Sequence, residues 1–399
     1  MKLEDIYAAR EVLKGVVHMT PLFFSQSCTD RAGNRIFLKG ENEQRTGSFK
    51  IRGAFNKIHH LTKKERESGV VASSAGNHAQ GVALAGREQN VGVTVVMPTT
   101  APLVKVEATK SYGAEVILHG ALYDDAYEKA REIERLTGKT FVHPYDDPYV
   151  IAGQGTVALE LLDQNPNLDT VVVCVGGGGL ISGIAVALKS LKPSIKVFGV
   201  QAQAAPSLYE SFKRKSLFRV DQPIKTIADG VAVKNPSETI LKNYLLGYVD
   251  DFCTVTEDEI ADAIVFVMER AKSVVEGSGV LGLAAVLNGH LKLGKETAIV
   301  LSGGNIDLKI ISRVIDRGLK KTGRLARIRV AVEDKPGILA DVAGIIAGGQ
   351  ANVLEVFHNR NQEGLFLQET SIEFVVETNS HEHVDRIKQV LCAAGHRIY

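Results

Sequence analysis

Lys50 is the residue of this sequence with the best setting for nucleophilic chemistry. It stands between a polar turn, RTGS at residues 45–48, and a segment, residues 51–58, whose apolar side chains recur at helical spacing. A lysine becomes an amine nucleophile near neutral pH when burial or a neighbouring cation lowers its pKa. Arg52 is a candidate for that cation, and the helix would fix the direction of the lysine side chain. Lysines at helix starts are common on protein surfaces, so Lys50 needs supporting residues.

A run of four glycines, at residues 176–179, ends an apolar segment and opens a helical one. Successive backbone N–H groups at a helix N-terminus form a binding site for a phosphate group. A dinucleotide-binding turn fits less well, because Ile181 or Ser182 occupies the place of its third small residue and Gln201 the place of its acidic residue. A plain strand-to-helix turn is the other alternative, although it would need only one or two glycines.

Two further polar turns follow apolar runs, SSAGNH at residues 73–78 and SGGN at residues 302–305. A placed lysine, a phosphate-binding turn and polar turns at strand ends together suit pyridoxal phosphate (PLP). This cofactor needs an amine that forms an imine, an anion site and a partner for its ring nitrogen.

The elements that must position these residues have the pattern of an α/β fold. From about residue 35 to about residue 300, short runs rich in valine and isoleucine alternate with longer segments of helical periodicity. Continuous apolar runs of this kind indicate strands buried on both faces, as in a parallel sheet wrapped by helices. Ligands bind at the carboxyl ends of such strands, so we expect the three turns to line one site.

After Gly323 the sequence changes character, and residues 327–399 predict an α+β module in the order βαββαβ. We therefore expect a catalytic domain at residues 1–322 with a smaller subdomain at roughly 40–144, a linker at 323–326, and the module at 327–399. Within the module, Asn379 and Glu382 form a capping box that opens the last helix. His381 and His383 are therefore expected to be solvated first-turn residues, not metal ligands.

The composition excludes several classes of partner. Lysine plus arginine (47) nearly equal aspartate plus glutamate (46) over 399 residues, which argues against a nucleic-acid or acidic-membrane partner. No leader-like or membrane-spanning run occurs, so a cytoplasmic location is expected. The four cysteines (Cys28, Cys174, Cys253 and Cys392) lack the paired spacing of a zinc site or a disulfide framework.

Four motifs, in this order, resemble those of the fold type II PLP enzymes, and among them the threonine dehydratases (threonine ammonia-lyases): ENEQRTGSFKIRGA, SSAGNHAQGVA, VGGGGLISG and LSGGNID. The resemblance implies a fold like that of the tryptophan synthase β-subunit, with two open twisted sheets wrapped by helices. The module at residues 327–399 resembles the ACT regulatory domain. One such module is typical of the intermediate-length form of the threonine dehydratases.

The resemblance assigns roles in cofactor binding by position. Lys50 would hold the cofactor through its amine and act as the catalytic base, and Phe49 would pack near the ring. Asn77 would hydrogen-bond the ring hydroxyl, and Ser302 would face the ring nitrogen. The phosphate would be held by Gly176, Gly177, Gly178, Gly179 and Leu180, and Gly230, in the segment Asp229-Gly230-Val231, would line the cofactor.

The substrate carboxylate would lie at Ser74, Ala75, Gly76, Asn77 and His78. For His78 a packing role is an equal alternative. Related serine racemases carry a serine, acting as an acid or base, where this chain has Ala75, and a methyl group cannot transfer protons. The acids by which racemases coordinate a divalent cation are replaced here by QAQAAPS at residues 201–207, so no metal is expected.

The activity that the resemblance implies is PLP-dependent conversion of L-threonine to 2-oxobutanoate and ammonia, with L-serine to pyruvate as a secondary activity. A serine racemase, or a synthase that replaces the β-substituent, is the alternative with the same cofactor. A non-catalytic amino-acid sensor is the alternative of another class. It is disfavoured, because Lys50, Asn77, Ser302 and the glycine turn would then have no joint purpose.

In the ACT-like module, Asp334, Gly337 and Asn352 would line an amino-acid effector site shared between two modules. The alternative is a plain helix-capping turn. A homodimer or homotetramer with paired modules is expected. Isoleucine biosynthesis and threonine degradation are both open as the physiological role. Short-form relatives bind an adenine nucleotide at positions matching Arg45, Thr46, Gln80 and Asn305, which is a further option here.

Overall fold

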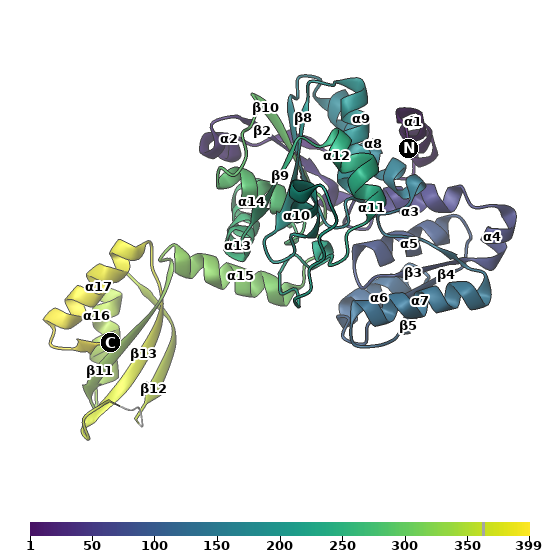
Figure 1. Cartoon of the computed structure of the whole chain (residues 1–399). Helices are drawn as coiled ribbons and strands as arrows, with labels where there is room; N and C mark the ends of the chain where they lie inside the picture. Colours follow the sequence, from purple (N-terminus) through teal and green to yellow (C-terminus); the bar gives the residue numbers. More distant parts are fainter. Residues whose placement is uncertain (361–363) are drawn as a thin grey trace. The chain divides into compact units, whose positions relative to one another are not determined.

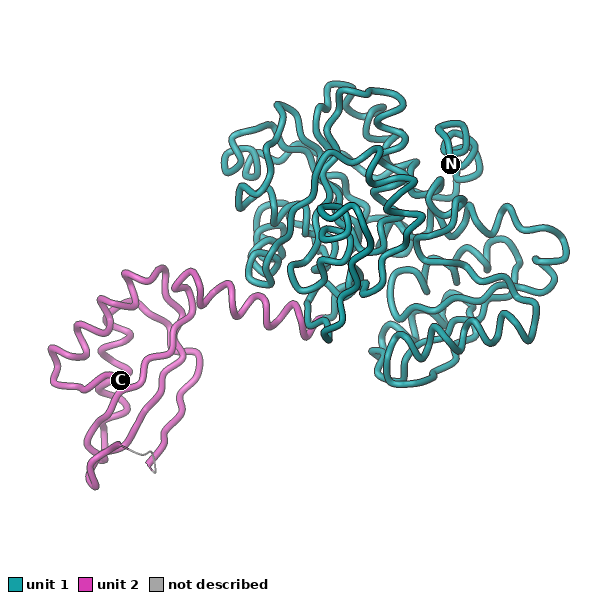
Figure 2. The backbone as a smooth tube through the Cα atoms, viewed as in Figure 1, with its two compact units in different colours: residues 1–307 teal, residues 308–399 magenta. Residues whose placement is uncertain are grey.

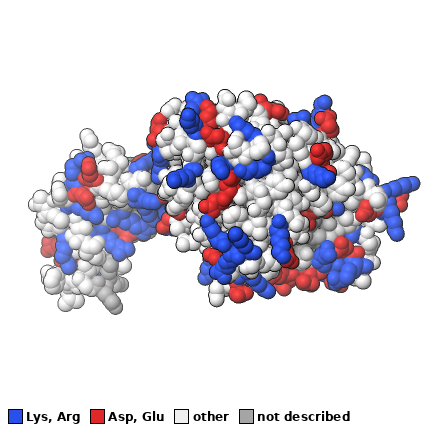
Figure 3. Space-filling view, turned by 45° about the horizontal axis from the view of Figure 1, so that its top comes forward, with Lys and Arg blue, Asp and Glu red and all other residues white. Residues whose placement is uncertain are grey.

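The computed structural model describes residues 1–360 and 364–399, and it divides into two compact units, residues 1–307 and 308–399 (Figure 2). Each unit has a hydrophobic core of its own. Basic and acidic side chains are interspersed on the face shown in Figure 3. Within the described ranges, no helix combines the length and the apolar character needed to cross a membrane.

A six-stranded sheet forms the centre of the first unit (Figure 1). Its strands lie in the order β1-β2-β10-β7-β8-β9, and all neighbours are parallel except β1 and β2. Every residue of β7 is buried, which confirms the prediction of a parallel sheet covered on both faces. The strands are β1 (Leu22–Phe24), β2 (Arg35–Gly40), β7 (Thr170–Cys174), β8 (Lys196–Ala202), β9 (Asp251–Val255) and β10 (Glu296–Leu301).

A second sheet of four parallel strands, in the order β5-β4-β3-β6, belongs to the same unit. Its strands are β3 (Val70–Ser73), β4 (Val93–Met97), β5 (Glu115–Leu118) and β6 (Thr140–Phe141). All four fall within the range expected for the smaller subdomain. The two sheets are the pair of open sheets that the fold type II resemblance implies.

Helices surround both sheets of the first unit (Figure 1). They are α1 (Leu3–Leu13), α2 (Gln26–Ala32), α3 (Lys50–His59), α4 (Lys63–Ser68), α5 (Asn77–Glu88), α6 (Leu103–Ser111), α7 (Tyr123–Thr137), α8 (Pro148–Gln164), α9 (Gly179–Leu191), α10 (Ser207–Arg214), α11 (Glu238–Ile240), α12 (Leu246–Tyr248), α13 (Glu257–Phe266) and α14 (Leu281–Leu287).

Glycine allows three of these helices to pack at close range. A Cβ added to Gly153 of α8 would lie 2.7 Å from the Cα of Gly53 in α3. One added to Gly183 of α9 would lie 2.8 Å from the Cα of Gly155 in α8. No side chain fits between backbones at these distances. Helix α3, which begins with Lys50, is therefore held firmly against the core.

The second unit begins with helix α15 (Leu308–Lys321) and continues as an antiparallel sheet in the order β12-β13-β11-β14. Its elements confirm the predicted βαββαβ order. They are β11 (Leu325–Glu333), α16 (Ile338–Gly348), β12 (Asn352–Asn359), β13 (Glu369–Glu377), α17 (His381–Ala393) and β14 (Arg397–Ile398). The domain boundary expected at residue 322 falls at the end of α15, and α15 itself groups with the second unit.

One expectation about the second unit is wrong. Helix α17 is capped by Ser380, whose hydroxyl accepts the N–H of His383 at 3.3 Å, and not by Asn379. His383 is 3% exposed, and both ring nitrogens have backbone partners: Nδ1 accepts from the Asn379 N–H (3.2 Å) and Nε2 donates to the carbonyl of Gly349 (2.7 Å). His383 is therefore a buried residue with backbone partners, and only His381 is exposed.

Candidate active site

Lys50 is the first residue of α3 and lies beside the carboxyl end of β10. The N–H of Phe49 donates to the carbonyl of Ser302 at 3.2 Å, which ties the start of the helix to the end of the strand. The ammonium of Lys50 donates to the carbonyl of Pro144 at 2.9 Å. The structure thus brings together Phe49, Lys50 and Ser302, three residues that the sequence placed in one site.

Burial of its amine lowers the pKa of Lys50 to about 8. Arg52 does not act as the expected cationic neighbour. Its guanidinium is buried inside the fold and forms ion pairs with Glu41 at 2.7 Å and Glu160 at 2.6 Å. The hypothesis that Arg52 activates the lysine is therefore corrected: desolvation is the main cause of the shift.

Asn77, the first residue of α5, is held on both sides of its amide. Its Nδ2 donates to Oε1 of Glu276 at 2.6 Å, and its Oδ1 accepts from Nδ2 of Asn305 at 2.8 Å. Asn305 Nδ2 also donates to the carbonyl of Thr46 at 2.7 Å, and a carbonyl can only accept. The Thr46 carbonyl therefore fixes the orientation of both side-chain amides: the Asn305 nitrogen donates, and the Asn77 oxygen accepts from it. The Asn77 nitrogen therefore points at Glu276 and has a second hydrogen to offer.

Glu276 is a residue of this site that the sequence did not reveal. It precedes α14, is 5% exposed, and donates its backbone N–H to the carbonyl of Gly303 at 3.0 Å. Desolvation, together with the carboxylate of Asp229, raises the pKa of Glu276 to about 7. Its segment, VVEGSGV, has the composition of an ordinary turn, so no signal in the sequence marked it.

The glycine turn leaves no space for side chains. Gly178 caps α9 with φ of 91°, a conformation that favours glycine. A Cβ added to Gly177 would lie 2.2 Å from the ring of Tyr145, and one added to Gly179 would lie 2.8 Å from the carbonyl oxygen of Tyr145. Tyr145 therefore forms a wall of this turn, a role that its position in the sequence did not indicate.

The surroundings of the turn fit the phosphate and ring of PLP. A Cβ on Gly176 would lie 3.0 Å from the Cα of Val231, and one on Gly230 would lie 2.9 Å from Oγ of Ser278. Among the described residues, the buried hydroxyls of Ser278 and of Ser182, in the first turn of α9 after Leu180, have no hydrogen-bond partner. A glycine-lined cradle with unused hydroxyls suits a group rich in acceptor oxygens.

Ser302 follows β10 and is 3% exposed. Its side chain hydrogen-bonds Cys174 at the end of β7, and burial raises the pKa of that thiol to about 11. The carboxyl ends of these two neighbouring strands therefore present a neutral hydroxyl and a neutral thiol near Lys50, and not a carboxylate.

The loop between β3 and α5 carries the residues expected to bind substrate. The N–H of Gly76 donates to Oγ of Ser74 at 3.1 Å. His78 is 3% exposed, and its Nε2 donates to the carbonyl of Val142 at 2.8 Å. Burial lowers the pKa of His78 to about 3, so the ring is neutral. This contact favours the packing role for His78, and substrate binding at Ser74, Ala75 and Gly76 stays a prediction.

The three residues expected to bind an effector lie at opposite ends of the second unit's sheet. Asp334 follows β11 and pairs with Arg360 at 2.8 Å, and Gly337 caps α16. Asn352 starts β12 and is paired with Glu377 at the end of β13. Glu377 is also paired with the first residue of β11, so Asn352 lies at the end of the sheet where β11 begins. One module alone therefore does not assemble these residues, and a site shared by two modules stays a prediction.

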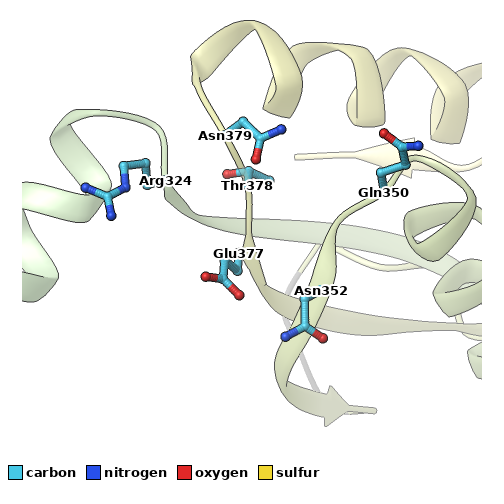
Figure 4. Close-up of a pocket in the computed structure, with 6 residues that line it drawn as sticks. All are labelled: Arg324, Gln350, Asn352, Glu377, Thr378 and Asn379. Carbon is cyan, nitrogen blue, oxygen red and sulfur yellow. The ribbon is translucent and has the colours of Figure 1, made fainter.

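Asn352 instead lines a pocket of about 380 Å³ at the junction between α15 and β11 (Figure 4). Its lining residues are all polar or charged: Arg324, Gln350, Asn352, Glu377, Thr378 and Asn379. The pocket lies wholly within the second unit.

Comparison with known proteins assigns the chain to a family. Residues 13–303 match the family of pyridoxal-phosphate dependent enzymes, and residues 326–396 match the ACT domain. The chain therefore belongs to the PLP-dependent enzymes and carries a C-terminal ACT domain, which confirms both resemblances. PLP is accordingly its cofactor.

Two relatives share almost the whole chain. An L-threonine ammonia-lyase of Thermotoga maritima is 50% identical over 99% of this chain and 98% of its own length, and one of Geobacter sulfurreducens is 42% identical over 98% of each. Among solved structures, the T.th. threonine deaminase is 41% identical with a TM-score of 0.73, over 77% of this chain and 99% of that one. Maize serine racemase is 35% identical with a TM-score of 0.75, over 80% of this chain and 98% of that one.

Proposed function

We propose that this chain is a PLP-dependent threonine ammonia-lyase, which converts L-threonine to 2-oxobutanoate and ammonia, and L-serine to pyruvate as a secondary activity. The observation that carries the proposal is the buried amine of Lys50, whose pKa is lowered to about 8. It lies near Ser302, which follows β10, and the neighbouring strand β7 leads into the glycine turn. The names of the two full-length relatives support threonine as the substrate.

The residues that would hold the cofactor are Lys50 through its amine, Asn77 through the second hydrogen of its amide nitrogen, Ser302 through its hydroxyl, and the glycine turn through its backbone N–H groups. When bound, PLP supplies an electron-withdrawing ring that weakens the bonds at the substrate's α-carbon. Ser302 is neutral, so it would not keep a proton on the nitrogen that it faces as an aspartate would. Such a partner favours elimination.

Lys50 is the group that we assign to proton transfer at the α-carbon. With its pKa lowered to about 8, part of the amine is neutral near pH 7 and can accept the α-proton. A lysine with the ordinary pKa of about 10.4 would be almost wholly charged. The carbonyl of Pro144, 2.9 Å away, can accept from the resulting ammonium. The β-hydroxyl takes up a proton and leaves as water, and a water molecule then hydrolyses the released product to the oxo acid and ammonia.

A serine racemase is the second candidate, because maize serine racemase has a similar fold. Racemisation needs a proton donor on the face of the α-carbon opposite Lys50. Ala75, at the position of the racemase serine, has no proton to give, and Ser74 stands one residue before that position. We therefore expect racemisation to be a minor reaction. A β-replacing synthase would use the same residues with an added nucleophile.

We further propose that the ACT domain binds an amino-acid effector and that the enzyme is a homodimer or homotetramer with paired ACT domains. The placement of Asp334 and Gly337 at one end of the sheet and of Asn352 at the other supports a shared site, because a second module would supply the missing end. In isoleucine biosynthesis the expected effector is isoleucine, the end product.

Product analysis tests the proposal. The PLP-loaded protein is incubated with L-threonine or L-serine, with and without an added thiol, and oxo acid, ammonia, D-serine and thioether products are measured. We expect 2-oxobutanoate and pyruvate as the main products, with or without the thiol. D-serine as the main product would favour the racemase, and a thioether in place of pyruvate would favour the synthase.

A further inference from the structure

The loop at residues 143–147 joins β6 of the smaller sheet to α8, and it borders two parts of the proposed cofactor site. The carbonyl of Pro144 accepts from the ammonium of Lys50 at 2.9 Å. The ring of Tyr145 covers Gly177, where an added Cβ would lie 2.2 Å from the ring. A change in the course of this loop would therefore move the hydrogen-bond partner of the lysine and the wall of the glycine turn together.

His143 holds this loop in shape. Its Nδ1 accepts from the backbone N–H of Asp146 at 2.8 Å and from that of Tyr145 at 3.3 Å. In the described part of the chain, neither N–H donates to a backbone carbonyl. The ring nitrogen thus occupies the place that a carbonyl takes in an ordinary turn.

The state of His143 suits this role. Its ring packs edge-on against Tyr145, with centroids 4.6 Å apart, and against Phe141, with centroids 6.0 Å apart. Burial lowers the pKa of His143 to about 4, so the ring is neutral near pH 7. Because Nδ1 accepts, the ring proton resides on Nε2.

We propose that His143 is a positioning residue of the active site: by accepting two backbone N–H groups, it sets the loop that presents the Pro144 carbonyl to Lys50 and the Tyr145 ring to the glycine turn. The role requires an acceptor atom at one place and not merely a ring of the right size. The inference rests on the proposed function in one respect, that Lys50 and the glycine turn bind PLP.

Three substitutions separate the acceptor from the ring. In His143→Asn, the Oδ1 of asparagine is as many bonds from Cα as the Nδ1 of the histidine that it replaces, so this variant keeps the acceptor. His143→Gln places its oxygen one bond further out, and His143→Ala removes the acceptor. The Kd of PLP for each cofactor-free protein is measured by absorbance titration, and circular dichroism verifies the fold. We expect the Asn variant to bind within about 3-fold of the wild type and the other two about 10- to 100-fold more weakly.

The chain offers a matched control. His383 also accepts a backbone N–H through Nδ1, that of Asn379 at 3.2 Å, but it lies in the second unit. His383→Ala should leave PLP affinity unchanged. A second readout is the split between kcat and KM for L-threonine. Because the loop holds Lys50 and not the substrate, kcat of the Ala variant should fall more than KM changes.

Equal PLP affinity of the wild type and the Ala variant would overturn the inference. So would an Asn variant as weak as the Ala variant, because that result would assign the effect to ring packing. If the Ala variant does not fold, the comparison of Asn with Gln decides: equal affinities contradict the inference, and weaker binding by Gln supports it. A wild type that itself binds no PLP would overturn the proposed function and the inference with it.

Discussion

Asn77 and Glu276 form a pair in which one residue was predictable and the other was not. Glu276 is a buried carboxyl whose pKa is raised to about 7 by desolvation and by Asp229, while Lys105, Asn77 and Lys50 act in the opposite direction. The unfolded chain ionises such a group near pH 4.5. Folding therefore favours the protonated form of Glu276, and the stability of the protein depends on pH through this residue.

The pH dependence of the Glu276→Gln variant tests this pair. The stability that protonated Glu276 contributes is fully present below pH 4.5 and is lost as pH rises to about 7. Over that range the unfolding free energy of the cofactor-free wild type should fall by about 2–3 kcal/mol because of Glu276. Urea unfolding at several pH values should show a smaller loss for Glu276→Gln and an unchanged loss for the exposed control Glu67→Gln. The same slope in wild type and Glu276→Gln would contradict a raised pKa.

Sequence motifs located Lys50, Asn77 and Ser302, because each stands in a run of residues with a recognisable chemistry. They could not locate Glu276, which reaches Asn77 from 199 residues away along the chain. They also placed Arg52 next to the lysine in sequence, whereas its side chain pairs with Glu41 and Glu160. Side-chain direction depends on partners brought in by the fold, and spacing in the sequence does not contain that information.

At the scale of elements, the turn before α9 depends on its contact with the loop after β6. Gly177→Ala would place a Cβ 2.2 Å from the ring of Tyr145, so either the turn or the loop must shift. We expect PLP to bind about 10-fold or more weakly, which an absorbance titration measures. The control is Gly92→Ala, where nothing lies within 4 Å of the added Cβ. Normal PLP affinity of Gly177→Ala would contradict the predicted phosphate site.

The existence of the strands was predictable from their continuous runs of valine and isoleucine, but their neighbours were not. Strand β10 is the last strand of the first unit, yet it lies between β2 and β7 and places Ser302 beside Cys174. Likewise, the register of β11, β12 and β13 sends Asn352 to the end of the sheet away from Asp334. Strand order and register are properties of long-range pairing, which local periodicity does not specify.

At the scale of the whole molecule, the two units carry separate sets of residues. All residues predicted to bind PLP fall within residues 1–307, and those predicted to bind an effector fall within residues 308–399. The predicted division into a catalytic part and a regulatory part therefore has a structural counterpart.

A chain shortened to residues 1–326 tests this division. Because the two cores are separate, the shortened chain should retain threonine turnover and lose inhibition by amino acids such as isoleucine. Steady-state kinetics over a range of isoleucine concentrations measure both properties. In the full-length chain, Asp334→Ala should weaken the inhibition and leave kcat unchanged. A shortened chain that is still inhibited would place the effector site in the first unit.

The measurement that tests the central claim most directly is threonine turnover with and without the amine of Lys50. The PLP-loaded wild type and Lys50→Ala are incubated with L-threonine, and 2-oxobutanoate and ammonia are followed together. The wild type should form both in equal amounts, and Lys50→Ala should be slower by about 10³-fold or more. Turnover by Lys50→Ala at the wild-type rate, or no 2-oxobutanoate from the PLP-loaded wild type, would contradict the proposed function.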